Sequence, residues 1–138
     1  MSDDGLVTIA SRHTVRETLD RLEKALKAKD ITVFARIDHA AGAASVAMPL
    51  RPTELLIFGN PKGGTPLMQS NQTVGIDLPL KCLVWQDAAD ATWISYNETT
   101  WIARRHQLST EFDSSVSYIA DVLSAMTRTS ANHGNQTV

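Results

Sequence analysis

The most distinctive chemistry in this sequence lies in a glycine-containing segment between an apolar strand and a predicted helix. Asn60-Pro61-Lys62-Gly63-Gly64-Thr65 follows the apolar run at 55–58, and Pro66 then stands where proline favours a helix start. Backbone N–H groups at a helix start attract anions, and Lys62 and Thr65 would add a charge and a hydroxyl. The segment lacks the Gly-Lys-Ser/Thr ending of a Walker A loop. It predicts a small anionic-ligand site or, as the alternative, only a tight turn with positive φ.

Titratable residues elsewhere would gather beside this segment if the strands that carry them are neighbours. Arg36 and Glu54 lie on two predicted strands, His39 follows the first strand, and Asp77 begins a third. A cation, two carboxylates and an imidazole at one end of a sheet can bind a small anion, hold a divalent metal or perform acid–base chemistry. His39, Glu54 and Asp77 are the acid–base candidates if the protein is an enzyme.

A structural interpretation of the same residues has equal weight. Asp38 would cap a short helix, Arg51 would pair with Glu54, and Lys81 would be exposed on its strand. The predicted ligand-binding residues, on the first interpretation, are Arg36, His39, Arg51, Glu54, Asn60, Lys62, Gly63, Gly64, Thr65 and Asp77.

Other reactive residue types give weaker signals. His13 and His106 stand at predicted helix ends, and Cys82 lies in an apolar strand without a neighbouring base. The sequence has no His-x-x-x-His or Cys-x-x-Cys pair, no Gly-x-Ser-x-Gly and no Gly-x-Gly-x-x-Gly. We therefore expect no metal site, and the sequence assigns neither catalytic residues nor a cofactor.

Composition narrows the possible partners. The 138 residues carry 13 Lys and Arg against 15 Asp and Glu, a net charge of −2, so nothing favours binding to nucleic acid. The single cysteine cannot form an internal disulfide, the N-terminal residues are acidic, and no apolar run is long enough to span a membrane. These features predict a cytoplasmic protein without a membrane partner.

Periodicity predicts the elements that must position these residues. Two-residue alternation marks strands near 6–10, 31–38, 76–84 and 92–96, while the run 55–58 reads as a central strand covered on both faces. Thr14 and Glu17 form a capping box before a helix whose apolar face contains Leu19 and Leu22. Further helices are expected after Asp38, from Pro66, after Asn97, and over 113–128.

These elements predict an α+β fold: a two-layer sandwich with a mixed, mostly antiparallel five-stranded sheet and helices mainly on one face. We expect residues 1–128 to form one domain and residues 129–138 to form a flexible tail. The predicted core consists of Val7, Ile9, Leu19, Leu22, Val33, Ile57, Phe58, Leu80 and Leu123.

Three segments carry a resemblance to a known family. Residues 50–69, with Leu-Arg-Pro-Thr-Glu followed by Phe-Gly-Asn-Pro, together with Asp77-Leu78-Pro79-Leu80-Lys81 and Ser95-Tyr96-Asn97, resemble the bacterial and archaeal family called domain of unknown function 302. The resemblance covers roughly residues 6–126. It implies a compact α+β domain capable of self-association, without an established activity or catalytic residues.

The sequence thus favours a module that binds a small anionic ligand; the alternatives are an acid–base enzyme and a purely structural dimerisation domain. We also expect a homodimer, because Trp93 and Trp101 or the edge of the strand at 92–96 would otherwise stay uncovered. Trp85 and Trp93 are expected to face each other across two strands.

Overall fold

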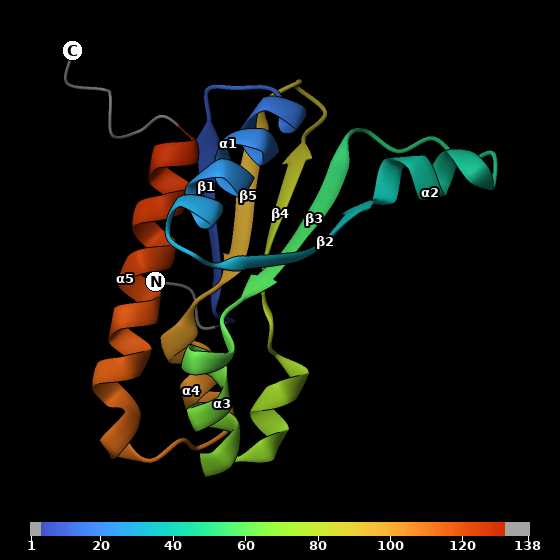
Figure 1. Cartoon of the computed structure of the whole chain (residues 1–138). Helices are drawn as coiled ribbons and strands as arrows, with labels where there is room; N and C mark the ends of the chain where they lie inside the picture. Colours follow the sequence, from blue (N-terminus) through green and yellow to red (C-terminus); the bar gives the residue numbers. More distant parts are fainter. Residues whose placement is uncertain (1–3, 132–138) are drawn as a thin grey trace.

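The computed structural model describes residues 4–131, which form an antiparallel five-stranded sheet and five α-helices, the α+β class expected from the sequence (Figure 1). The strands lie in the order β1-β5-β4-β3-β2, and every neighbouring pair is antiparallel. Their bounds are β1 Leu6–Ser11, β2 Thr32–Asp38, β3 Thr53–Gly59, β4 Leu80–Gln86 and β5 Thr92–Asn97. The α-helices are α1 Val15–Ala28, α2 His39–Ser45, α3 Pro61–Ser70, α4 Thr99–Arg105 and α5 Asp113–Ser130, and the 3-10 helices are Gln72–Ile76 and Thr110–Phe112.

The main core lies between the sheet and the two long helices, α1 and α5. The predicted capping box begins α1: the Thr14 Oγ1 accepts from the Glu17 N–H, and the Thr14 N–H donates to the Glu17 carboxylate, each at 3.1 Å. The helix then buries one leucine face against β3, β4, β5 and α5. The buried members of this core are Val15, Leu19, Leu22, Leu26, Leu56, Phe58, Cys82, Val84, Ile94, Leu123, Met126 and Ala131.

The opposite face of the sheet carries no helix (Figure 1). Strand alternation therefore separates neighbours in β3: Phe58 is fully buried under the helices, whereas Ile57 is only partly buried and faces the other way. The prediction that this strand is covered on both faces, with Ile57 in the core, was wrong. Trp85 and Trp93 are opposite each other in register, as expected, with ring centroids 6.3 Å apart.

Two strand assignments also differ from the prediction. β4 begins at Leu80 instead of residue 76, because residues 72–76 form a 3-10 helix. β5 is an interior strand, since β1 pairs with it along its full length, so the predicted free edge at residues 92–96 does not exist. The edges are β1 and β2.

Helix ends were predicted with mixed success. The Asp38 carboxylate accepts from the Ala41 N–H at 2.8 Å and caps α2, as expected. Asn97 ends β5 instead of capping α4, which follows Glu98 without a side-chain cap. α5 continues to Ser130, two residues past the predicted end, and residues 132–138 of the predicted tail lie outside the described residues.

Candidate ligand-binding pocket

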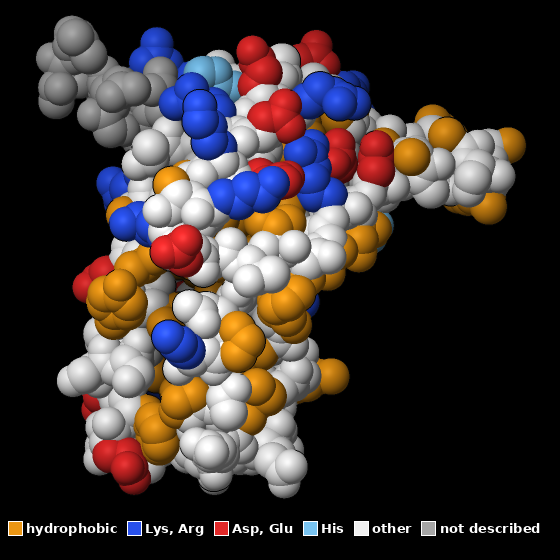
Figure 2. Space-filling model, in the orientation of Figure 1, with side chains coloured by type: hydrophobic (Ala, Val, Ile, Leu, Met, Phe, Trp, Pro, Cys, Tyr) orange, Lys and Arg blue, Asp and Glu red, His pale blue; other side chains and the backbone are white. Residues whose placement is uncertain are grey.

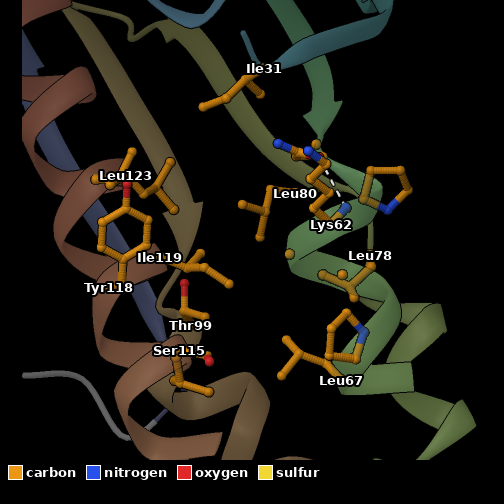
Figure 3. Close-up of a pocket in the computed structure, with 18 of the residues that line it drawn as sticks. Ile31, Lys62, Leu67, Leu78, Leu80, Thr99, Ser115, Tyr118, Ile119 and Leu123 are labelled. Atoms are coloured by element: carbon orange, nitrogen blue, oxygen red, sulfur yellow. Dashed lines mark hydrogen bonds between the residues drawn. The ribbon is translucent and has the colours of Figure 1, made fainter. Parts of the chain in front are cut away.

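A pocket of about 1020 Å³ opens between α3 and α5 at the lower end of the sheet (Figure 3). Ligand pockets typically occupy about 300–1000 Å³, so its size suits a small organic molecule. Its walls are mainly aliphatic, and hydrophobic side chains gather on the surface over α3 and the adjoining part of α5 (Figure 2). The apolar side chains in these walls include Ile31, Phe58, Leu67, Met68, Leu78, Leu80, Ile102, Val116, Ile119, Val122, Leu123 and Met126.

The predicted glycine loop is part of α3, which forms one wall of this pocket. Asn60 caps the helix: its Oδ1 accepts from the Lys62 N–H at 3.0 Å, and its carbonyl oxygen accepts from the N–H groups of Gly63 and Gly64. Pro66 stands inside the helix and does not begin it. The prediction that N–H groups of this segment are free to attract an anion was therefore wrong, because those of Lys62, Gly63 and Gly64 already have acceptors.

Neither Gly63 nor Gly64 has a positive φ, so a tight turn does not explain them either. Glycine inside a helix is unfavourable by about 1 kcal/mol relative to alanine. A β-carbon on Gly63 would meet only the Ile119 Cδ1 atom, at 4.0 Å, and one on Gly64 would meet Leu78 and Met68 at 3.6 and 3.8 Å. The two glycines therefore leave open the space that larger side chains would take from the pocket.

The charged residues that line the pocket are both lysines. Lys62 is the second residue of α3, Lys29 follows α1, and no Asp or Glu is among the lining residues in the described part of the chain. Both lysines are exposed, and neither forms an ion pair within residues 4–131. The pocket thus combines apolar walls with an edge that carries positive charge and no negative charge.

Thr99, the first residue of α4, supplies a buried hydroxyl to this apolar environment. Its side chain points into the pocket (Figure 3), and the residue is 4% exposed. Thr99 Oγ1 is one of two buried side-chain polar atoms in the described part of the chain without a hydrogen-bond partner; the other is His13 Nε2. Buried hydroxyls nearly always have a partner, so this atom is unusual.

The structure brings five of the ten predicted site residues to the pocket: Asn60, Lys62, Gly63, Gly64 and Thr65. The other five predicted residues do not line the pocket: Arg36, His39, Arg51, Glu54 and Asp77. Asn60 and Asp77 lie near the end of β3 at Gly59, where β3 meets the start of β4, whereas Asp38 pairs with Glu54 at the opposite end of that strand. The predicted convergence of all these residues at one end of the sheet was therefore wrong.

Arg36 is held between α1 and the sheet. Its guanidinium contacts Asp20 at 2.8 Å, Glu23 at 3.4 Å and Glu54 at 3.5 Å. The hydrogen bond that Arg36 donates to the Asp20 carboxylate is the largest influence on this group, and it raises the pKa of Arg36. Arg36 and Glu54 thus form a structural ion-pair network.

Arg51 pairs with Asp90 at 3.0 Å, so its predicted pairing with Glu54 was wrong. His39 is exposed at the start of α2.

Asp77 has partners that the sequence did not indicate. Its carboxylate lies 3.0 Å from Arg105 and 2.5 Å from His106 Nε2, while His106 Nδ1 lies 2.9 Å from Thr73 Oγ1. The hydroxyl of Thr73 also contacts Asn71 Oδ1, and none of these residues lines the pocket. This set ties the 3-10 helix at 72–76 to the end of α4, and Asp77 is far from its predicted acid–base partners His39 and Glu54.

Two further features limit the chemistry within residues 4–131. No group of three or more metal-ligating side chains is close enough to hold an ion there. Cys82 is fully buried, and burial raises the pKa of its thiol, which keeps it protonated and unreactive.

No helix within residues 4–131 combines the length and hydropathy needed to cross a membrane.

The sheet order and the pocket define an α+β domain built around an apolar cavity at one end of an antiparallel sheet. The chain belongs to the DUF302 family, a domain of unknown function, whose model matches residues 7–129. The crystal structure of an uncharacterized conserved DUF302 protein from Bacillus stearothermophilus has the same fold, with a TM-score of 0.78 over 88% of this chain and 94% of that chain at 22% identity. The resemblance expected from the sequence is thus confirmed.

Curated relatives carry a different kind of name. Proteins called fluoride-specific ion channel FluC 1 from Brucella suis biovar 1 (strain 1330) and FluC 2 from Brucella melitensis biotype 1 are each 47% identical to this chain over 111 residues. The match covers 80% of this chain but 44% and 41% of those proteins. The chain therefore spans less than half the length of these relatives.

Proposed function

We propose that this domain binds a small, mainly apolar molecule that carries an anionic group, in the pocket between α3 and α5. The observation that carries the proposal is the combination of a large aliphatic pocket with two lysines and no acidic residue among its lining side chains. Apolar walls would supply affinity, and Lys62 and Lys29 would orient the anionic end toward solvent.

The glycines of α3 support the same proposal. A helix that keeps two adjacent glycines without positive φ gives up stability, and here the missing side chains border the pocket. Reduced stability at a functional site is common, because the geometry that function requires is seldom the most stable one.

Fluorescent probes test the proposal directly. 1-Anilinonaphthalene-8-sulfonate is apolar and anionic, and N-phenyl-1-naphthylamine is its neutral counterpart. We expect saturable binding of both, and we expect Lys62→Ala to weaken the anionic probe about tenfold while leaving the neutral one unchanged. Lys27→Ala is the matched control, because this lysine pairs with Glu23 on α1 and does not line the pocket.

A pocket-filling variant separates this site from other apolar surfaces. Ile119→Trp places a large ring in the pocket and should abolish saturable binding of both probes, as fluorescence titration would show. Unaltered binding of both probes by the Trp variant, with its fold retained, would reject the proposal.

The names of the Brucella proteins raise fluoride as another ligand. A single small ion would not fill an aliphatic pocket of about 1020 Å³, so we do not expect sodium fluoride to displace either probe. The cytoplasmic location and the homodimer stay predictions; sedimentation at micromolar concentration checks the dimer, and a monomeric mass would contradict it.

A further inference from the structure

We infer that the ligand of this pocket carries a second, uncharged polar group, a hydroxyl or carbonyl oxygen within its apolar body that accepts a hydrogen bond from Thr99. The inference rests on the proposed function, since it names the chemistry of the molecule that the pocket would bind. It starts from Thr99 Oγ1, which is buried without a hydrogen-bond partner.

Thr99 is the one polar residue among the buried side chains that line the pocket within the described range. The others in that group are apolar: Phe58, Leu67, Ile102, Val116, Leu123 and Met126. The serine and tyrosine side chains of the α5 wall, Ser114, Ser115 and Tyr118, are exposed. Among the buried side chains of the described residues, the interior therefore offers a ligand one hydrogen-bonding atom, the Thr99 Oγ1, in apolar surroundings.

This arrangement gives the pocket two separate polar points. Lys62 and Lys29 are exposed charges at its edge, and Thr99 is an uncharged hydroxyl in its interior. A plain alkyl or aryl anion would satisfy the lysines and leave Thr99 without a partner. A ligand with an oxygen partway along its apolar body would satisfy both, and a site with a buried hydrogen-bonding group discriminates strongly against analogues that lack the partner.

The alternative is that Thr99 is a structural residue whose hydroxyl has no role. Valine has nearly the same shape and no hydroxyl, so Thr99→Val distinguishes the two. If the hydroxyl serves only a ligand, its removal should leave the thermal midpoint of the free protein unchanged or higher, because no protein hydrogen bond is lost.

The experiment compares decanoate with a series of monohydroxydecanoates that differ in the position of the hydroxyl, each measured by displacement of 1-anilinonaphthalene-8-sulfonate. We expect one position to bind the wild-type protein at least tenfold more tightly than decanoate. Thr99→Val should abolish that preference, because decanoate then leaves no buried hydroxyl unpaired, and Thr99→Ser, which keeps the hydroxyl, should retain it.

Two results would overturn the inference while the proposed function stands. One is a wild-type protein that binds decanoate as tightly as every hydroxylated member; the other is a Thr99→Val variant that keeps the full preference. If Thr99→Val fails to fold, Thr99→Ala provides the same comparison. Failure of the wild-type protein to bind decanoate, the hydroxylated series and the probe would instead reject the proposed function and this inference with it.

Discussion

Gly63 in α3 faces Ile119 in α5 across the pocket, and a β-carbon on Gly63 would stand 4.0 Å from the Ile119 Cδ1 atom. The space between the two helices therefore admits a methyl group without strain but not a larger side chain without loss of pocket volume. Substitutions of different size at Gly63 can therefore change the stability of the protein and its ligand binding separately.

We expect Gly63→Ala to raise the free energy of unfolding by about 0.5–1 kcal/mol, because alanine is the better helix former and no atom obstructs it. Gly63→Leu should extend toward Ile119 and reduce probe affinity. Urea denaturation and probe titration measure the two effects. Gly42→Ala in α2, where a β-carbon meets nothing within 4 Å, is the control that should leave probe binding unchanged.

Gly5, unlike Gly63, has no room for a β-carbon. Its φ is +75°, and a β-carbon there would lie 2.3 Å from the Trp101 ring. Gly5→Ala should lower the free energy of unfolding by at least about 2 kcal/mol, since backbone strain and steric overlap add. Denaturant midpoints against the wild-type protein test this, and a change below about 0.5 kcal/mol would contradict the described position of Trp101.

Phe58 and Ile57 should respond differently to truncation. Phe58→Ala removes a fully buried ring from the main core and should cost about 3–5 kcal/mol. Ile57→Ala acts on the face without helices and should cost less than about 1.5 kcal/mol. Equal shifts in the denaturant midpoint for the two variants would show that both faces of β3 are covered, for example by association with another molecule.

Acid should weaken the network around Arg36. Hydrogen bonds from Lys27 and then Arg36 hold the pKa of Glu23 below its ordinary value of 4.5. Because the folded-state pKa is lower than the unfolded one, ionised Glu23 contributes full stability above about pH 5, and the contribution disappears as the pH falls through the lowered value.

Glu23→Gln removes this titration. Its free energy of unfolding, measured by urea denaturation from about pH 6 to about pH 3, should therefore decline less steeply than that of the wild-type protein. Glu111→Gln, on the exposed 3-10 helix at 110–112, is the control. Parallel curves for wild type and Glu23→Gln would contradict the ion-pair geometry.

Local signals in the sequence predicted much of the fold. The box of Thr14 and Glu17 and the cap at Asp38 were predicted correctly because each depends on residues within three positions. The start of α3 at Pro61 was not predicted, because adjacent glycines intrinsically favour a turn. Here tertiary packing overrides that preference. The interior position of β5 depends on β1, far away in the sequence, which no local pattern reveals.

The candidate site was harder to predict. Lys62 and Gly63 were identified through residue type, but as parts of a loop with free N–H groups. Thr99 and Ile119 were missed, because a pocket is the volume left between helices, and its walls come from segments that meet only in the fold. Arg36 and Asp77 attracted attention as titratable residues, although their partners satisfy them in structural contacts.

The pairing of β1 with β5 has a consequence for synthesis on the ribosome. β2, β3, β4 and β5 follow one another in the chain and in the sheet, so these hairpins can form as the residues emerge. β1 leaves the ribosome before the other four strands but must wait for its partner at Thr92–Asn97, and α1 must wait longer for α5. The nascent chain therefore carries an unpaired strand and an incompletely covered leucine face until β5 and α5 have been synthesised, the period in which chaperone contact would protect it most.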